Sequence, residues 1–479
     1  MPPGNDSLAA GTSLGTVESY GGGGARPRHS QPPVALITVV LWISTAAGRW
    51  TTALAAPRIL TVCLAFLVVR VRTSWSGVLI VVVLGITGGA REWSVTQVRA
   101  GECGGKARVL TDPVSFGASA SVVVDLGGMR VRASAHGPRS ARISRLSAGQ
   151  VVEVRGTCAP VRGQRVAREL VNHIRGRMAV SEVSEFPSDG GGMWRAANRV
   201  RTVFLHGTRT MGPDDAALFA GLVIGDDSRQ PREMVDRFRG SGLSHLCSVS
   251  GQNVAFVMAA FSPLLRRLRP LARLLATLAV ITWFVFLTRA EPSVLRAAVM
   301  ASVVALNFFR GRTLNGRAVL CVSVCVLLVA DPLLAFSVGF MLSAGATAGL
   351  AWFSGPLSRW LRLPGVVTAT VAAQMGTLPV AVLVFGRLPL VSLVANPLAV
   401  PVAGMVMLLG VPAALLAGVL PVAPATVLGT SMAMPTRYVA TVARLCSGVE
   451  PHGITAFACW LALACLVVLR VRRHPSVAG

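Results

Sequence analysis

The sequence predicts a polytopic α-helical membrane protein with one small all-β extracytoplasmic module inserted into it. Of the 479 residues, 53% are hydrophobic and only 14% are charged, and the mean hydropathy is +0.62. Ordinary globular chains carry about 25% charged residues. Several apolar runs of roughly 17 to 25 residues follow one another, and each is long enough to cross a bilayer. One polar segment with β-type patterning interrupts these runs.

The N-terminal part begins with residues 1–33, which are polar and rich in Gly and Pro. They contain no apolar signal-peptide core, so we expect a disordered cytoplasmic tail. Residues 34–91 are predicted to form the N-terminal transmembrane helices, with apolar runs at 34–48, 57–72 and 76–90. Basic residues before the first run and after the second fit the positive-inside rule, which then places the next segment outside.

Residues 92–188 are predicted to form that small β module. β-branched residues alternate with other types between Gly, Asp and Pro turns, and the Gly127–Gly128 pair predicts a hairpin. Five or six short strands of this kind are most simply an OB-like barrel. Its two cysteines, Cys103 and Cys158, are either two unpaired thiols or a disulfide, and an extracytoplasmic location favours the disulfide.

The charge balance is strongly basic, with 46 Lys and Arg against 20 Asp and Glu, a formal charge of +26. Arginine-rich cytoplasmic loops explain such a balance in a membrane protein, whereas attraction to a polyanion such as nucleic acid is the functional alternative. Basic clusters at 266–273, 308–317, 359–364 and 470–474 fall at alternate ends of apolar runs. This periodicity places those loops and the C-terminus in the cytoplasm.

Residues 189–243 are predicted to be a linker followed by amphipathic or soluble helices. Asp214 and Asp215 are placed at a helix start, where the helix dipole favours negative charge. The apolar face that includes Trp194 and Phe204 could lie along a membrane surface.

Residues 244–471 are predicted to form the main transmembrane part, and residues 472–479 a second cytoplasmic tail. Spans are expected at 244–264, 272–288, 293–309, 316–330, 335–353, 366–386, 389–419, 424–446 and 453–470. The run at 389–419 is long enough for one long helix or two short ones.

Polar residues gather at the start of the first of these spans, in GLSHLCSVSGQNVAF. Polar groups inside a membrane usually face a cavity or a partner. His245, Ser250, Gly251 and Asn253 are therefore candidates for lining a pore or for making structural hydrogen bonds. Ser250 and Gly251 could also interrupt the helix, which is tolerated at membrane depth only where protein or water satisfies the freed backbone.

Three further polar residues lie inside apolar runs. Arg296 cannot lose its charge, so it needs a carboxylate such as Glu291, a water-filled cavity, an anion or a position near the external surface. Gln374 and Asn396 are each followed by a proline within a few residues, which suggests two interrupted helices along a translocation path. Small residues and prolines that merely aid helix packing are the alternative.

No catalytic motif is recognisable. The sequence has no P-loop, no GxSxG motif, no zinc-type spacing of Cys and His and no paired carboxylates within a span. We therefore expect a conduit or binding protein rather than an enzyme, with no cofactor and no metal.

The segment GLVIGDDSRQPREMVDRFRGSGLSHLCSVSGQNVAFV resembles the signature of the ComEC competence family, membrane proteins that internalise DNA during natural transformation. The residues that match this signature in order are Gly242, Leu243, Ser244, His245, Leu246, Ser250 and Gly251. PSVLRAAVMA, ADPLLAFSVGFMLSAGATAGL and AAQMGTLPVAVLVFG with VSLVANPLAVPV match later blocks of the family, also in order. Together the blocks cover residues 205–410.

The resemblance implies that single-stranded DNA passes through a pore in the plasma membrane and that the OB-like module holds the strand outside. Basic residues of the module would contact phosphates. The candidates are Arg130, Arg132, Arg142 and Arg145. Aromatic residues for base stacking are nearly absent from the module.

The sequence departs from the family pattern in two places. Asn253 stands where many members carry His, and we expect no metallo-β-lactamase-like domain of the kind that ends many members. The activity of that domain is then either absent or supplied by a separate nuclease. Other expected partners are the lipid bilayer, a membrane DNA receptor, a cytoplasmic helicase or ATPase, and a second copy of the chain in a homodimer. The alternative function is a permease or envelope protein for another polyanion or solute.

Overall fold

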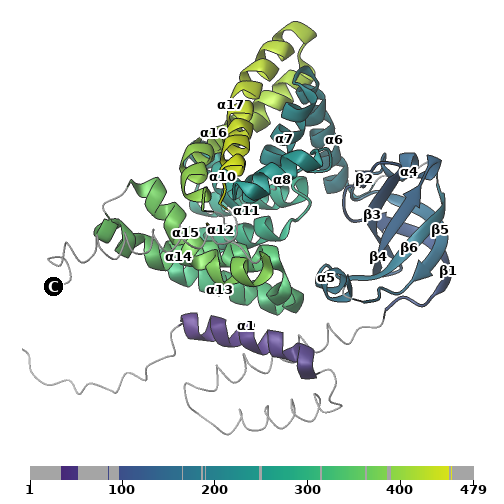
Figure 1. The fold of residues 1–479 in the computed structure, drawn as a ribbon, viewed down its shortest axis with the longest axis horizontal. Coiled ribbons are helices and arrows are strands. Elements are labelled where there is room, and N and C mark those ends of the chain that lie inside the picture. The colour runs from purple at the N-terminus through teal and green to yellow at the C-terminus, as the bar shows by residue number, and fades with distance from the viewer. Residues whose placement is uncertain are drawn as a thin grey trace, which may run out of the picture.

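A computed structural model describes most of the chain. The described residues are 34–51, 85, 97–163, 165–184, 187–188, 190–247, 251–312, 315–361, 364–385, 390–451 and 455. Both predicted tails, Ser250, the run at 57–72, and nearly all of the runs at 76–90 and 453–470 lie outside these residues. Figure 1 shows a small β-barrel beside a larger helical body.

Six strands form one sheet. They are β1 (Gly101–Val109), β2 (Val114–Phe116), β3 (Ser119–Leu126), β4 (Met129–His136), β5 (Val151–Ala159) and β6 (Ile174–Val183). The sheet order is β1-β5-β6-β4-β3-β2, and an additional pairing of β1 with β3 closes five of the strands into a barrel. β4 and β6 pair in parallel, and the other pairs are antiparallel. This closed five-stranded barrel agrees with the predicted OB-like module.

The barrel follows from strict alternation in the sequence. Val131, Ala133 and Ala135 of β4 point into a core of Val and Ala side chains, while the residues between them face outward. Gly127 and Gly128 have φ values of 60° and 84°, as a two-residue hairpin turn between β3 and β4 requires. The other two long connections contain α4 (Pro138–Ile143) and α5 (Arg165–Val171).

A disulfide joins neighbouring strands of the barrel. Cys103 of β1 and Cys158 of β5 are bonded, with their Cα atoms 5.8 Å apart. Cys158 is buried in the barrel core. The bond therefore ties the first strand to the fourth of the five strands that close the barrel.

Short helices lead from the barrel into the helical body. They are α6 (Gly192–Gly207), η1 (Thr208–Thr210), α7 (Pro213–Ile224) and α8 (Arg232–Gly240). The apolar face of α6 does not lie free for a membrane surface, because Phe204 is buried and stacks on Phe219, with ring centroids 5.5 Å apart. Asp214 and Asp215 occupy the first turn of α7, as predicted, and Asp215 pairs with Arg437 at 2.6 Å.

The helical body contains the longest helices. They are α9 (Ser244–Cys247), α10 (Gly251–Leu265), α11 (Pro270–Leu287), α12 (Pro292–Phe309), α13 (Gly316–Ala330), η2 (Pro332–Phe336), α14 (Val338–Leu361), α15 (Gly365–Phe385), α16 (Ser392–Val419) and α17 (Val422–Gly448). α1 (Val34–Thr51) packs beside α13, and Leu41 belongs to the same apolar cluster as Leu320. Among the described residues, five helices (α11, α12, α14, α15 and α16) are long and apolar enough to cross a membrane; α10 and α13 are apolar but shorter.

The structure corrects the expectation of two interrupted helices. α15 continues through Pro379, and α16 is one long helix that continues through Pro397, Pro401 and Pro412. A proline inside a helix removes one backbone hydrogen bond, which packed neighbours compensate without ending the helix. In the first predicted span, α9 covers Ser244–Cys247 and α10 covers Gly251–Leu265. The residues between them, Ser250 included, lie outside the described ranges, so the interruption at Ser250 and Gly251 stays a prediction.

Small residues let several helices approach closely. A Cβ atom added at Gly349 of α14 would lie 2.0 Å from the carbonyl oxygen of Ala372 in α15. α6 and α16 meet in the same way, because a Cβ atom at Gly207 would lie 2.0 Å from the carbonyl oxygen of Ala414. α6 is thus packed into the helical body as closely as the apolar helices pack on one another.

Candidate functional site

Arginines line part of the outer surface of the barrel. Arg130 and Arg132 alternate with buried residues of β4, so both side chains leave the barrel. The parallel register places Arg177 of β6 beside Arg132. Arg177 was not among the predicted candidates, although the alternation in IRGRMAV contains the signal that identifies it.

A buried carboxylate lies among these arginines. Glu169 of α5 is bonded to Arg132, with 2.8 Å between Oε2 and Nη2, and lies 3.8 Å from Arg177. α5 therefore crosses the outer surface of β4 and β6, and Glu169 offsets part of its positive charge. Arg130 remains exposed.

The other two predicted DNA-binding candidates lie elsewhere on the barrel. Arg142 is in α4 and Arg145 follows it, at the end of the barrel where β4 finishes, and both are exposed. The four predicted arginines thus form two groups rather than one continuous patch.

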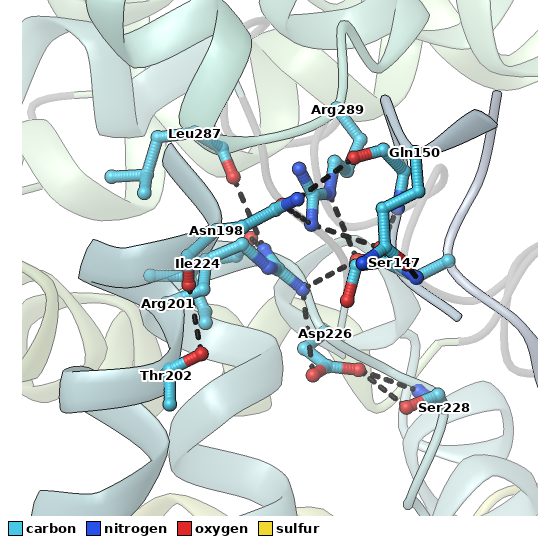
Figure 2. Close-up of polar contacts among 12 residues, drawn as sticks. Ser147, Gln150, Asn198, Arg201, Thr202, Ile224, Asp226, Ser228, Leu287 and Arg289 are labelled. Carbon is cyan, nitrogen blue, oxygen red and sulfur yellow. Dashed lines mark hydrogen bonds and ion pairs between the residues drawn. The ribbon is translucent and has the colours of Figure 1, made fainter. Parts of the chain in front are cut away.

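A buried network of charges attaches the barrel to the helical body (Figure 2). Asp112, between β1 and β2, accepts two hydrogen-bonded contacts from Arg289, each 2.9 Å long, and lies 3.0 Å from Arg201 of α6. Arg201 also lies 3.4 Å from Asp226, in the connection between α7 and α8. The network contains two cations and two anions, and every side chain in it is at most one quarter exposed.

Neutral groups also take part in the network. Arg201 donates to the carbonyl oxygens of Ile224 and Leu287 at 3.2 and 3.1 Å. Asn198 of α6 accepts a hydrogen bond from Arg289 at 2.8 Å and donates to the carbonyl oxygen of Ala148 in the barrel at 3.0 Å. Barrel, α6 and the connection between α11 and α12 are therefore held in one hydrogen-bonded unit.

The network also fixes the ionisation of its central acid. Burial by itself raises the pKa of Asp112, but the neighbouring guanidinium groups of Arg201 and Arg289 outweigh burial, so its pKa lies below the ordinary value. Asp112 is thus a carboxylate at neutral pH.

A second contact joins the barrel to the helical body. His173, between α5 and β6, lies 2.9 Å from Asp331, measured from Nε2 to Oδ2. Asp331 also caps η2 by accepting a hydrogen bond from the backbone of Leu333 at 3.0 Å. Since the first contact is near α4 and the second near α5, the barrel is attached at two separate places.

The polar residues at the start of the first predicted span lie in different environments. Asn253 is buried in α10 and donates to the carbonyl oxygen of Leu222 in α7 at 3.0 Å. His245 of α9 is exposed, and Gly251 begins α10. Asn253 therefore makes a structural hydrogen bond, whereas the role of His245 stays a prediction.

Arg296 is buried in α12, with 6% of its surface exposed. Its guanidinium donates to the hydroxyl of Ser343 in α14, with 2.9 Å from Nε, and contacts the sulfur of Met300. Glu291, the carboxylate that the sequence offered as one possible partner, directly precedes α12 but forms no ion pair with Arg296. Among the described residues no carboxylate forms an ion pair with Arg296, so its charge is solvated by neutral groups alone.

The remaining two candidates lie on α15 and α16. Gln374 donates a hydrogen bond to Ser392, which joins the middle of α15 to the start of α16. The side-chain oxygen of Asn396 is buried without a hydrogen-bond partner in the described part of the chain. The structure thus does not bring Arg296, Gln374 and Asn396 into one hydrogen-bonded cluster.

No metal centre was predicted. Within the described ranges, no three side chains of His, Cys, Asp or Glu form a group that could hold a metal ion.

A small β-barrel fixed to a bundle of apolar helices defines the class: a multi-pass helical protein with an inserted barrel. The family model described as "Competence protein" matches residues 222–473, more than half of the chain. The chain therefore belongs to the competence protein family, which confirms the resemblance seen in its signature blocks.

Three curated relatives show the same relationship. The chain is 27% identical over 234 residues to "ComE operon protein 3" of Bacillus subtilis (strain 168), covering 48% of this chain and 30% of that protein. It is 32% identical over 231 residues to "Competence protein ComA" of Neisseria gonorrhoeae (46% and 33%), and 28% identical over 205 residues to "Uncharacterized protein YcaI" of Escherichia coli (strain K12) (39% and 27%). The matches span about a third of the length of these relatives. No solved structure matches the chain.

Proposed function

We propose that the chain is a membrane channel component that carries single-stranded DNA into the cell during natural transformation. The observation that carries this proposal is the combination of a competence-family helical body with an arginine-bearing barrel attached to the ends of its helices. Two relatives are named as a ComE operon protein and a competence protein.

The barrel is suited to phosphates rather than bases. Arg130 and Arg132 present cations on its outer surface, whereas Phe116 is the only aromatic residue between positions 97 and 183. Aromatic side chains provide base stacking, and cations provide contacts to any nucleic acid backbone. We therefore propose binding that is independent of sequence and that weakens strongly with salt.

Within the helical body, Arg296 is the proposed contact for the passing backbone. Its buried guanidinium contacts Ser343 and Met300 and lacks an acidic partner among the described residues, so a phosphate would supply the missing negative charge. His245, Gly251 and the unsatisfied oxygen of Asn396 are the other proposed pore candidates.

We also propose a topology for this process. The barrel lies outside the plasma membrane, where its disulfide is stable, and both termini lie in the cytoplasm. A DNA receptor, a helicase or ATPase, a separate nuclease and a second copy of the chain are proposed partners. The chain itself carries out no catalytic step in this proposal.

The test is DNA import in cells of the source organism that lack the chain and are complemented with variants. Labelled DNA that becomes resistant to external nuclease is measured, with membrane insertion checked for each variant. We expect import to be lost without the chain and to fall at least tenfold with Arg296→Gln. Arg444→Gln, at an exposed position of α17, is the matched control and should import normally.

Normal import in cells that lack the chain would contradict the proposal. It would instead favour transport of another polyanion or solute by the same helices.

A further inference from the structure

We propose that Asp112, Arg201, Asp226 and Arg289 are positioning residues that hold the barrel in one orientation on the helical body. A DNA strand bound on β4 is then presented to the helices rather than to the surrounding solution. This inference rests on the proposed function and adds to it the device that aligns binding with passage.

The geometry of the charged network restricts the orientation of the barrel relative to the helical body. Arg289 binds Asp112 through a two-pronged contact, Nε to Oδ2 and Nη2 to Oδ1, both at 2.9 Å. Such paired contacts fix direction as well as distance. A buried ion pair adds little net stability compared with apolar packing, so its best-supported role is to specify one arrangement among several.

Backbone strain is concentrated at the same places. Among the described residues, only three that are not glycine have a positive φ: His173 at 59°, Arg289 at 62° and Ala290 at 55°. Residues with a Cβ atom rarely adopt this conformation, and it persists where surrounding contacts require it. All three lie at the two attachments of the barrel, since Ala290 adjoins Arg289 and His173 contacts Asp331.

The two attachments lie at opposite ends of the arginine-bearing strand. β4 begins near α5 and His173, and it ends at His136, next to α4 and the loop that contains Ala148. α5 itself packs beside η2 of the helical body. A rigid body held at two separated points cannot swing about either, so the strand between them keeps a fixed relation to the helices.

The first test measures barrel placement without DNA. His173→Cys and Asp331→Cys are introduced together and joined by a short bismaleimide, and the bridged peptide is quantified. We expect Asp112→Asn or Arg289→Gln to reduce the yield of the bridge at least fivefold. Asp236→Asn, which breaks an exposed ion pair on α8, should leave it unchanged. An unchanged yield in both junction variants would overturn the proposal, whatever the protein transports.

The second test measures binding and import separately. In the junction variants, we expect the intact protein to retain a labelled single strand within twofold of the unmodified chain, while import falls at least tenfold. The Cys103–Cys158 bond should still protect both thiols from alkylation until reductant is added, which shows that the barrel is folded. Import within twofold of normal would overturn the positioning role.

A rescue separates positioning from misfolding. In the Asp112→Asn background, joining positions 173 and 331 with the bismaleimide should restore import at least fivefold, because a covalent link replaces the lost alignment. Failure of the formed link to restore import would overturn the proposal. If the unmodified chain imports no DNA, the proposed function fails, and the yield of the bridge still decides the role of the junction.

Discussion

Loss of the Cys103–Cys158 disulfide should lower the free energy needed to open the barrel, by an amount that follows from the length of the loop that the bond closes. The bond joins residues separated by 55 positions in the sequence. The chain-entropy model for closing a loop of this length gives a stabilisation of about 4 kcal/mol. Because about 1.4 kcal/mol corresponds to a tenfold change in an equilibrium constant, the open form of the barrel should become up to about a thousandfold more populated.

Hydrogen exchange of the whole protein in detergent, read by mass spectrometry, measures this change. Peptides that cover β1 and β5 should exchange up to about a thousandfold faster in Cys103→Ser with Cys158→Ser than in the unmodified chain. Reductant should accelerate exchange in the unmodified chain and have no further effect on the double variant, which is the matched control. Peptides from α16 should change little, because that helix lies outside the closed loop.

Equal exchange in the two proteins would refute the reasoning. It would mean that the sheet and the attachment to the helices already prevent opening, so that loop closure contributes nothing measurable. Labelling of both thiols in intact cells without reductant would refute the extracytoplasmic placement on which the disulfide depends.

Three other changes have expected outcomes. Glu450→Gln should lower the stability of the helical body by about 1–2 kcal/mol, seen as a lower thermal midpoint, because the Glu450 carboxylate accepts backbone hydrogen bonds from Leu390 and Val391, both at 2.9 Å. Gly349→Ala should cost about 1–3 kcal/mol by the same measurement, because of its close approach to α15, whereas Gly355→Ala, in open space on the same helix, should be neutral or mildly stabilising. The pKa of Asp112 lies below its ordinary value, so the contribution of Asp112 to attachment is complete above about pH 4 and is lost as the pH falls through the folded-state pKa. Hydrogen exchange around Ala148, followed as the pH is lowered, should show this loss. Asp112→Asn should abolish this pH dependence.

The barrel and most helices could be predicted because their signals are local. Period-2 alternation with the Gly127–Gly128 turn specifies strands and a hairpin, and long apolar runs specify helices. The disulfide could be anticipated because both cysteines lie in the one polar segment. The single helix at 392–419 was harder, since prolines predict breaks and only packing partners, which are absent from the sequence, allow the helix to continue.

The junction could not be predicted in the same way. Asp112 precedes a proline, and this pattern predicts only a turn. Arg201 is one of several arginines on a predicted amphipathic helix. Their pairing depends on three segments that are distant in sequence and meet only after folding. Arg296 shows a different limit: the sequence left open a carboxylate such as Glu291, a cavity, an anion or an external position, and the fold supplies the hydroxyl of Ser343.

The packing of α6 against α16 has a consequence for exchanging parts between relatives. The family match begins at residue 222. However, Phe219 packs against Gly410 and Val203 packs against Gly418, and both Phe219 and Val203 precede that boundary. A chimera joined at residue 222 would therefore pair an α16 from one parent with unsuited side chains from the other. A junction before Gly192 keeps these helix contacts, and it should preserve function only where the parent that supplies the barrel also carries Asp112 and His173 for the contacts with Arg289 and Asp331.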